Sequence, residues 1–197
     1  MSTDLLLPPL RFKGERPYVQ GPDLFNAIQV AARERLGRSA WVERAVIREM
    51  ATGPVEVAEG DVDAAKGVFD VREADERHRF SLVDAVGDVQ LAREPYDESM
   101  IVEGGRYSTD RGTFEGVMPH TVMEVVTSLA KTLHNRELPV SDAKWIWVGV
   151  ALDRALPDVA TKAEVVIRRR LGSRLTMSDL VIDGDAVGSM TFAARTL

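Results

Sequence analysis

The chain has 197 residues, enough for one compact domain or for two small halves that share a core. Its hydrophobic content of 45% and charged content of 28% are ordinary for a globular protein and exclude a collagen-like or disordered chain. The net charge of −6 and the lack of a continuous basic patch argue against a nucleic-acid partner.

The chain contains no cysteine, which excludes disulfides, thiolate nucleophiles and cysteine-based metal sites. Near the N-terminus, the apolar run 5–7 is followed at once by Pro8-Pro9 and is too short for the core of a signal peptide. No apolar run approaches the roughly 20 residues needed to span a bilayer. We therefore expect a cytoplasmic protein with no membrane partner.

The first elements in chain order are a strand over about 10–19, interrupted by Gly14 and Pro17, and a helix over 22–36. Pro22 suits the first helical position, where its missing N–H would have no partner in any case. Gly37 stands where a helix end favours a left-handed residue. The helix carries an apolar stripe at helical spacing, which predicts that it is largely buried: Leu24, Phe25, Ile28, Ala31, Ala32 and Leu36.

Strands are predicted after this helix, because β-branched and apolar runs alternate with Gly-Pro and Gly-Asp turn signals. The segment 93–105 is the expected connection between an N-terminal half, 1–97, and a C-terminal half, 98–197. The predicted strands of the first half are 41–50, 55–58, 67–73, 77–84 and 88–92.

The second half repeats this layout. A weak strand is predicted over 99–107, followed by a helix that begins at Pro119, runs to Leu133 and is closed by Asn135. The strands predicted after it are 144–153, 160–171, 175–182 and 185–194.

A short internal repeat supports two like halves. The tetrapeptide Asp-Ala-Val-Gly occurs at 84–87 and again at 185–188, and Pro22 and Pro119 stand 97 residues apart. We expect both tetrapeptides to lie in the same late-strand turn. The predicted class is α+β, with each half a curved antiparallel sheet wrapped around one long helix. The halves would join as a pseudo-dimer with an internal pseudo-twofold, and a site is expected at the seam.

Four segments carry a resemblance to the hotdog fold of acyl-thioester hydrolases and hydroxyacyl-thioester dehydratases. The segment 183–192 is similar to the last hairpin of hotdog thioesterases, and 163–170 looks like the long strand before it. The segment 116–119 is similar to the helix entry of the dehydratases, and 112–116 resembles a Gly-His-Phe-Pro-Gly segment there. The resemblance covers most of 99–197 and, through the repeat, 10–95.

The resemblance implies a tandem, or double, hotdog. The sequence contains no glycine-rich dinucleotide motif and no P-loop phosphate motif, and no cofactor is expected. Its substrate would be an acyl thioester of coenzyme A or of an acyl carrier protein, processed by hydrolysis or by hydration/dehydration. A homodimer of double hotdogs is a further expectation. The arginines at 168–170 are one candidate docking point for an acidic carrier protein, although composition favours the simpler explanation of solvated strand arginines.

Departures from the dehydratase pattern leave an alternative open. Thr113 stands where the dehydratases have histidine, Glu115 where they have proline, and their helix glutamate would fall nearer Val125 than Glu124. The alternative is a non-catalytic hotdog module that binds an acyl group or a protein partner. A third interpretation is a β-rich assembly domain with no small-molecule site.

His120 is the main catalytic candidate. It is expected in the first turn of the second helix, where the helix dipole favours a neutral imidazole that can act as a base. Glu124, four positions on, would share that helix face and orient the ring, and the first free N–H groups of the helix would polarise a thioester carbonyl. An exposed first-turn pair is the competing structural explanation.

Asp23 occupies the corresponding place in the first half and is the expected acid across the seam, although an aspartate in a first turn is also favourable for the helix itself. The expected substrate-binding residues are Asn26, Tyr18, Glu115 and Thr121. No metal site is predicted, because the three histidines, His78, His120 and His134, are far apart in sequence.

Overall fold

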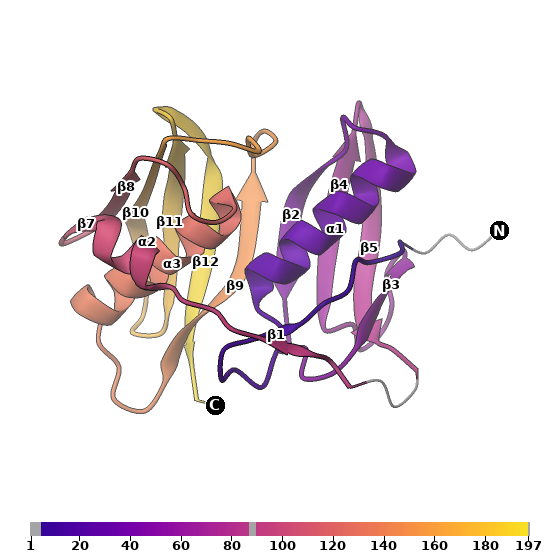
Figure 1. Cartoon of the computed structure of the whole chain (residues 1–197), viewed down its shortest axis with the longest axis horizontal. Helices are drawn as coiled ribbons and strands as arrows, with labels where there is room; N and C mark the ends of the chain where they lie inside the picture. The colour runs from indigo at the N-terminus through magenta and orange to yellow at the C-terminus, as the bar shows by residue number, and fades with distance from the viewer. Residues whose placement is uncertain (1–4, 87–89, 197) are drawn as a thin grey trace. The chain divides into compact units, whose positions relative to one another are not determined.

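The computed structural model of the protein describes residues 5–86 and 90–196. The chain divides into two compact units, Met1–Tyr96 and Asp97–Leu197. Figure 1 shows that each unit has one long helix against its own antiparallel sheet. Within the described residues, no helix is both long enough and apolar enough to span a membrane.

In the first unit, α1 (Gly21–Leu36) covers a four-stranded antiparallel sheet. The strand order is β3 (Val55–Glu59), β5 (Glu76–Asp84), β4 (Gly67–Glu73) and β2 (Trp41–Ile47). The predicted helix is confirmed. Pro22 lies in its first turn, and Gly37 ends it with a φ of 126°.

The core of this unit lies between α1 and the sheet, as the apolar stripe predicts. Ile28 of the helix and Phe69 and Phe80 of the sheet are fully buried. Gln29 holds the helix to β2 with its side-chain amide. Its nitrogen donates to the Ala40 carbonyl at 2.8 Å, and its oxygen accepts from the Val42 N–H at 2.9 Å.

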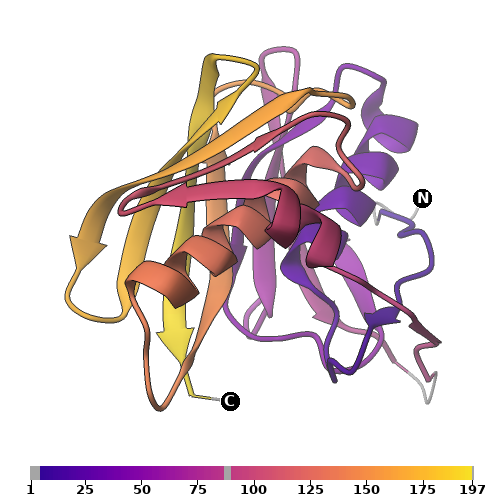
Figure 2. The same cartoon turned by 60° about the vertical axis from the view of Figure 1, so that its left-hand side comes forward.

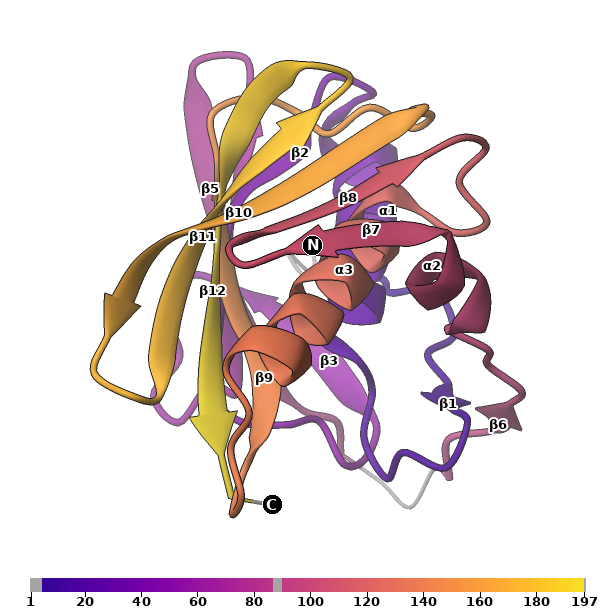
Figure 3. The ribbon, with the colours of Figure 1, turned by 90° about the vertical axis from the view of Figure 1, so that its left-hand side faces the viewer.

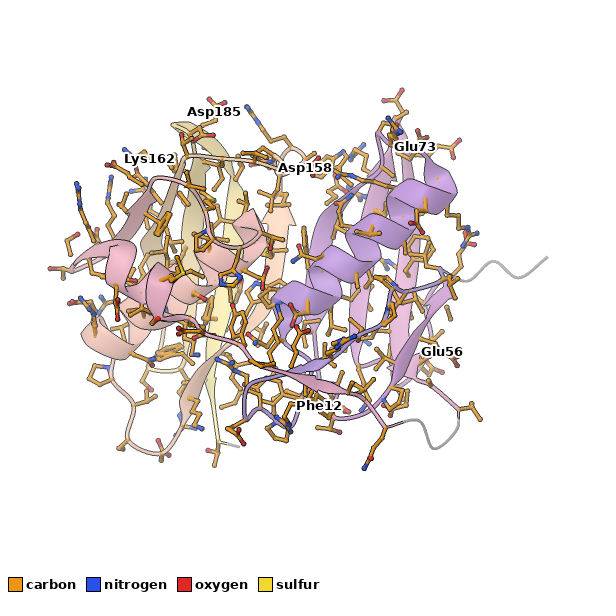
Figure 4. All side chains as sticks on the ribbon, in the orientation of Figure 1. Phe12, Glu56, Glu73, Asp158, Lys162 and Asp185 are labelled. Carbon is orange, nitrogen blue, oxygen red and sulfur yellow. The ribbon has the colours of Figure 1, made fainter. Side chains whose placement is uncertain are left out.

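A short parallel ribbon joins the two ends of the first unit. β1 (Phe12–Lys13) pairs with β6 (Arg93–Glu94), and the Arg93 guanidinium donates to the carbonyl oxygen of Gly14. Figure 4 labels Phe12 on this ribbon. The long strand predicted over 10–19 is therefore wrong, because Gly14 turns the chain after two residues. Of the strand predicted over 88–92, residues 90–92 are not in a strand and 88–89 lie outside the described residues.

In the second unit, the sheet curves around one side of α3 (Val122–Glu137), as Figures 2 and 3 show. The helix contacts β8, β9 and β10. All neighbours in this sheet are antiparallel. The strand order is β9 (Lys144–Leu152), β12 (Asp185–Arg195), β11 (Leu175–Ile182), β10 (Lys162–Leu171), β8 (Arg111–Glu115) and β7 (Gly105–Ser108).

Two predictions for the second unit are wrong. The segment 99–107 forms α2 (Ser99–Gly104) and the start of β7, not one strand. The long helix begins at Val122 instead of Pro119 and continues through Asn135 to Glu137. The Asp97 carboxylate favours α2, because it accepts the backbone N–H of Ser99 at 2.8 Å, in the first turn.

The order of elements repeats, but the strand pairing does not. After the long helix, the first strand pairs with the third in one unit (β2 with β4) and with the fourth in the other (β9 with β12). The tetrapeptides also differ in place. Asp84 is the last residue of β5, whereas Asp185 is the first residue of β12, after a turn at Asp183-Gly184. The expectation of one shared late-strand turn is therefore wrong, and Gly87 lies outside the described residues.

Candidate functional site

The entry to α3 is built by a capping box. The Thr121 hydroxyl oxygen accepts the backbone N–H of Glu124 at 3.3 Å, and the Glu124 carboxylate accepts the backbone N–H of Thr121 at 3.2 Å. Each of these donors would otherwise lack a partner at the helix start. The Thr-x-x-Glu spacing is visible in the sequence and fixes the helix start at Val122, three residues after the proline that suggested another start.

His120 therefore does not lie in the first helical turn. It stands one residue before the N-cap, half-buried, in the bend between β8 and α3. The N–H groups of Val122 and Met123 follow it, and an α-helix supplies no acceptor for its first N–H groups. His120 is therefore close in sequence to the positive end of the α3 helix dipole.

Glu124 is 7% exposed, and its carboxylate also accepts the Thr121 hydroxyl at 2.8 Å. Both residues therefore have a structural role at the helix start. Because His120 is outside the helix, the expected alignment of His120 and Glu124 on one helical face is wrong.

The structure brings an unpredicted carboxylate, that of Asp97, near His120. The pKa of Asp97 lies below its usual value, chiefly because its carboxylate accepts the backbone N–H and the hydroxyl of Ser99, and to a smaller extent because of the positive charge of protonated His120. Lys131 of α3 and Glu98 form an ion pair at 3.0 Å beside it. The Asp-x-Ser spacing was the available signal for Asp97, but only tertiary structure places it by His120.

Glu115 lies in a surface ion network at the end of β8. Its carboxylate is 3.3 Å from the ammonium nitrogen of Lys162, which is labelled in Figure 4, and 3.8 Å from the Arg106 guanidinium. Glu164 pairs with the same ammonium at 3.0 Å, and the hydrogen bonds to Glu164 and Glu115 raise the pKa of Lys162. These contacts give Glu115 a structural role as one member of a solvent-exposed network of ion pairs.

In the first unit, Asp23 is held by an ion pair in the first turn of α1. Its carboxylate accepts from the Lys13 ammonium at 2.7 Å, and both side chains are 14% exposed. The same ammonium lies 4.6 Å from the centre of the Tyr96 ring. Asn26 is half-buried one turn further along α1, and Tyr18 is half-buried before the helix. Asp23 and Asn26, three residues apart, occupy neighbouring positions on one helix surface.

A buried histidine was missed as a structural centre of the second unit. His134 is fully buried in α3, with Nδ1 2.5 Å from the Ala130 carbonyl oxygen and Nε2 2.5 Å from the Thr176 hydroxyl. A carbonyl only accepts, so Nδ1 carries the proton and Nε2 accepts the Thr176 hydroxyl. Burial lowers the pKa of His134, which keeps the ring neutral. The ring is stacked on Phe192 with centres 5.0 Å apart.

Among residues 5–86 and 90–196, no cluster of three or more His, Asp or Glu side chains could hold a metal ion. A hollow of about 300 Å³ lies beside the buried histidine, and Trp145, Arg170 and Thr176 are among its lining residues.

Comparison with solved structures shows which fold the two units resemble. The dehydratase domain of PpsC from Mycobacterium tuberculosis in complex with C12:1-CoA matches with a TM-score of 0.53 and 10% identity, over 90% of this chain and 85% of that chain. The pyran synthase domain from module nine of the sorangicin pathway matches with a TM-score of 0.53 and 12% identity, over 90% and 86%. The dehydratase domain from the CurK module of curacin polyketide synthase matches with a TM-score of 0.50 and 10% identity, over 90% and 82%.

The fold is a hotdog fold. Sequence identities of 10–12% support this statement about the fold alone. Any statement about the reaction must be argued from the residues of the site. No protein-family model and no curated protein sequence matches the chain.

Proposed function

We propose that the protein is a double hotdog that acts on acyl thioesters of coenzyme A or an acyl carrier protein, by hydration/dehydration or by hydrolysis. The observation that carries the proposal is His120 at the entry of the hotdog helix, one residue before the N-cap and two before the first of the helical N–H groups, which an α-helix leaves without internal acceptors. The likeness to dehydratase domains over 90% of the chain supports the choice of substrate class.

In dehydration of a 3-hydroxyacyl thioester, the neutral His120 ring would take the proton from C2. The Val122 and Met123 N–H groups would stabilise the negative charge that develops on the thioester oxygen. The C2–H electrons form the double bond as the C3–O bond breaks, and the departing hydroxyl needs a proton to leave as water. We assign that proton donation to Asp23, which the repeat relates to His120 and which would first have to leave the Lys13 ammonium and take up a proton. In hydrolysis, His120 would instead take a proton from the attacking water.

The remaining candidates have binding roles in this proposal. Asn26 and Tyr18 would contact the acyl group from the first half, and Glu115 and Thr121 would contact the acyl group or its carrier from the second half. The proposed seam needs both halves, so the two units would work as one pseudo-dimer. A homodimer of such chains, in the reducing environment of the cytoplasm, completes the proposal.

A non-catalytic binding module is the second candidate, and three observations favour it. Thr113 replaces the histidine of the dehydratase segment, the Glu124 carboxylate is engaged by Thr121, and the Asp23 carboxylate is engaged by Lys13. A protein that retains the fold and holds these carboxylates in structural contacts could bind an acyl group without turning it over.

The test is turnover of a panel of 3-hydroxyacyl-, enoyl- and saturated acyl-CoA thioesters, followed by enoyl absorbance and by release of free thiol. His120→Ala should lower kcat/KM by about 100-fold or more, and Asp23→Asn should lower kcat, since general acid and base groups contribute on this scale. His78→Ala, in the other unit, is the matched control.

Unchanged turnover in both site variants would remove His120 and Asp23 from the mechanism. Saturable acyl-CoA binding with no turnover at any chain length would replace the enzyme by the binding module.

A further inference from the structure

A row of charged side chains crosses the face of the first sheet that is turned away from α1. Register places Arg44 of β2 opposite Asp70 of β4, and Asp70 opposite Arg79 of β5. The next row on the same face is Val46 opposite Val68. On this face of the sheet, a negative side chain thus lies between two positive ones, next to a pair of valines.

Arg79 fully engages the central carboxylate. Its Nε and Nη2 donate to the two Asp70 oxygens at 2.7 and 3.2 Å, and its Nη1 donates to Asp61 at 3.3 Å. These contacts raise the pKa of Arg79. Asp70 is only 4% exposed although it lies on the open face of the sheet. The Arg79 and Asp70 side chains are therefore held in one fixed position, because such a two-point contact restrains both groups.

Arg44, on the other side of Asp70, is exposed and forms no ion pair with any residue in the described part of the chain. Arg48 follows it by four residues, so the two arginines and Val46 between them lie on the same face of the sheet. Together with Val46, Val68, Asp61, Asp70 and Arg79, they line a hollow of about 230 Å³. The lining of the hollow thus combines two valines with three arginines and two carboxylates.

The charge of the residues that line this hollow is opposite in sign to the net charge of the whole protein. The chain as a whole has a net charge of −6. The charged residues that line the hollow are three arginines and two carboxylates, a surplus of one positive charge: Arg44, Arg48 and Arg79, with Asp61 and Asp70. Such a local reversal attracts an anion to a protein that otherwise repels it.

We propose that this hollow binds a small phosphate ester, with the phosphate on Arg44 and Arg48 and its apolar part on Val46 and Val68. A guanidinium donates two parallel N–H groups to a phosphate, which a lysine cannot do. Arg79 is a positioning residue that holds Asp70 out of the anion's way. The site lies outside the proposed acyl-thioester machinery, and its failure would leave that proposal unchanged.

The probe is phenyl phosphate, titrated into protein labelled at valine methyl groups and arginine side chains and followed by NMR. We expect saturable shifts at Val46, Val68 and Arg44, and an affinity that falls as salt rises. Arg44→Gln should weaken binding about tenfold, as loss of a charge-assisted contact does. Arg154→Gln, on an exposed arginine paired with Asp185 in the second unit, should leave the affinity unchanged.

Three further arms decide the chemistry. Binding of phenol tests the apolar part of the ligand alone, and binding of inorganic phosphate tests the anion alone. Arg44→Lys keeps the positive charge but removes the two parallel N–H groups of the guanidinium. Phenyl phosphate should bind more tightly than either fragment, and Arg44→Lys should recover only part of the affinity. Equal binding of inorganic phosphate and phenyl phosphate, equal affinity of Arg44→Gln and the original protein, or no shift at Val46 and Val68 would each overturn the proposed site.

Discussion

The Glu124 carboxylate accepts both the backbone N–H and the hydroxyl of Thr121, while the Thr121 oxygen accepts the backbone N–H of Glu124. This reciprocal contact sets where α3 begins and hence where His120 stands relative to the first helical N–H groups.

Thr121→Ala should lower the free energy of unfolding by about 1 kcal/mol, because the helix start loses its N-cap acceptor. Urea denaturation followed by circular dichroism measures the change. Ser141→Ala, at an exposed position after the same helix, is the control and should change little. Equal stability of the two variants would contradict the structural role of the capping box.

His134 should make stability fall in mild acid. Because burial lowers its pKa, the unfolded chain takes up a proton below the ordinary value near 6.5 while the folded protein does not. The stabilising contribution is full above about pH 6.5. It then decreases, by up to about 1.4 kcal/mol per pH unit, until the pH reaches the lowered folded pKa.

Urea denaturation at pH 7.5, 6.0 and 5.0 measures this slope. His134→Gln should be less stable at pH 7.5 and should lose less stability on acidification, whereas His78→Gln should retain the original slope. Parallel pH profiles for His134→Gln and the unsubstituted protein would show that the buried ring does not control this window.

Gly188→Ala should destabilise the second unit strongly. Gly188 has a φ of 144° at an irregular point of β12, and an added Cβ would overlap the carbonyl oxygen of Ala151 in the paired strand. We expect a loss of about 3 kcal/mol from overpacking and backbone strain together. Gly184→Ala isolates the backbone contribution, because Gly184 also has a positive φ but has open space around its Cβ position. Thermal denaturation of both variants separates the two effects, and equal losses would exclude the steric one.

Asp70→Ala should cost more stability than Asp61→Ala, although both carboxylates pair with Arg79. The Asp70 side chain is 6% exposed and that of Asp61 is 72% exposed, so only the former holds the guanidinium against the sheet. We expect about 2 kcal/mol for Asp70→Ala and less than about 1 kcal/mol for Asp61→Ala. Chemical denaturation provides both values, and the reverse order would mean that the buried pair does not stabilise the sheet.

The sequence predicted elements well where both ends carried a local signal. The strands at 67–73 and 175–182 have the predicted bounds, because apolar alternation ends at Gly, Asp or Glu-rich turns on each side. The start of α3 differs from the prediction because Pro119 is a weaker start signal than the capping box of Thr121 and Glu124, whose N-cap stands two residues later.

Other features could not be predicted because they depend on tertiary pairing. In the first unit, β2 pairs with β4, and β4 pairs with β5. This choice of neighbours depends on how whole strands pack together, and the local sequence does not specify it. The row of Arg44, Asp70 and Arg79 exists only in one register of three strands. Likewise, the contact of His134 with Thr176 joins residues 42 positions apart.

The parallel ribbon of β1 and β6 means that the first unit is closed by both of its own ends. Residues 12–13 bind residues 93–94, and Lys13 also holds Asp23 at the start of α1 and faces the ring of Tyr96. Removing the first sixteen residues would therefore release the segment that leads out of the unit and would expose the start of α1. Proteolytic cleavage near residue 14 should therefore loosen residues 93–96, which lie almost eighty positions further along the chain and lead into the second unit. The N-terminal segment thus stabilises the segment that connects the two units.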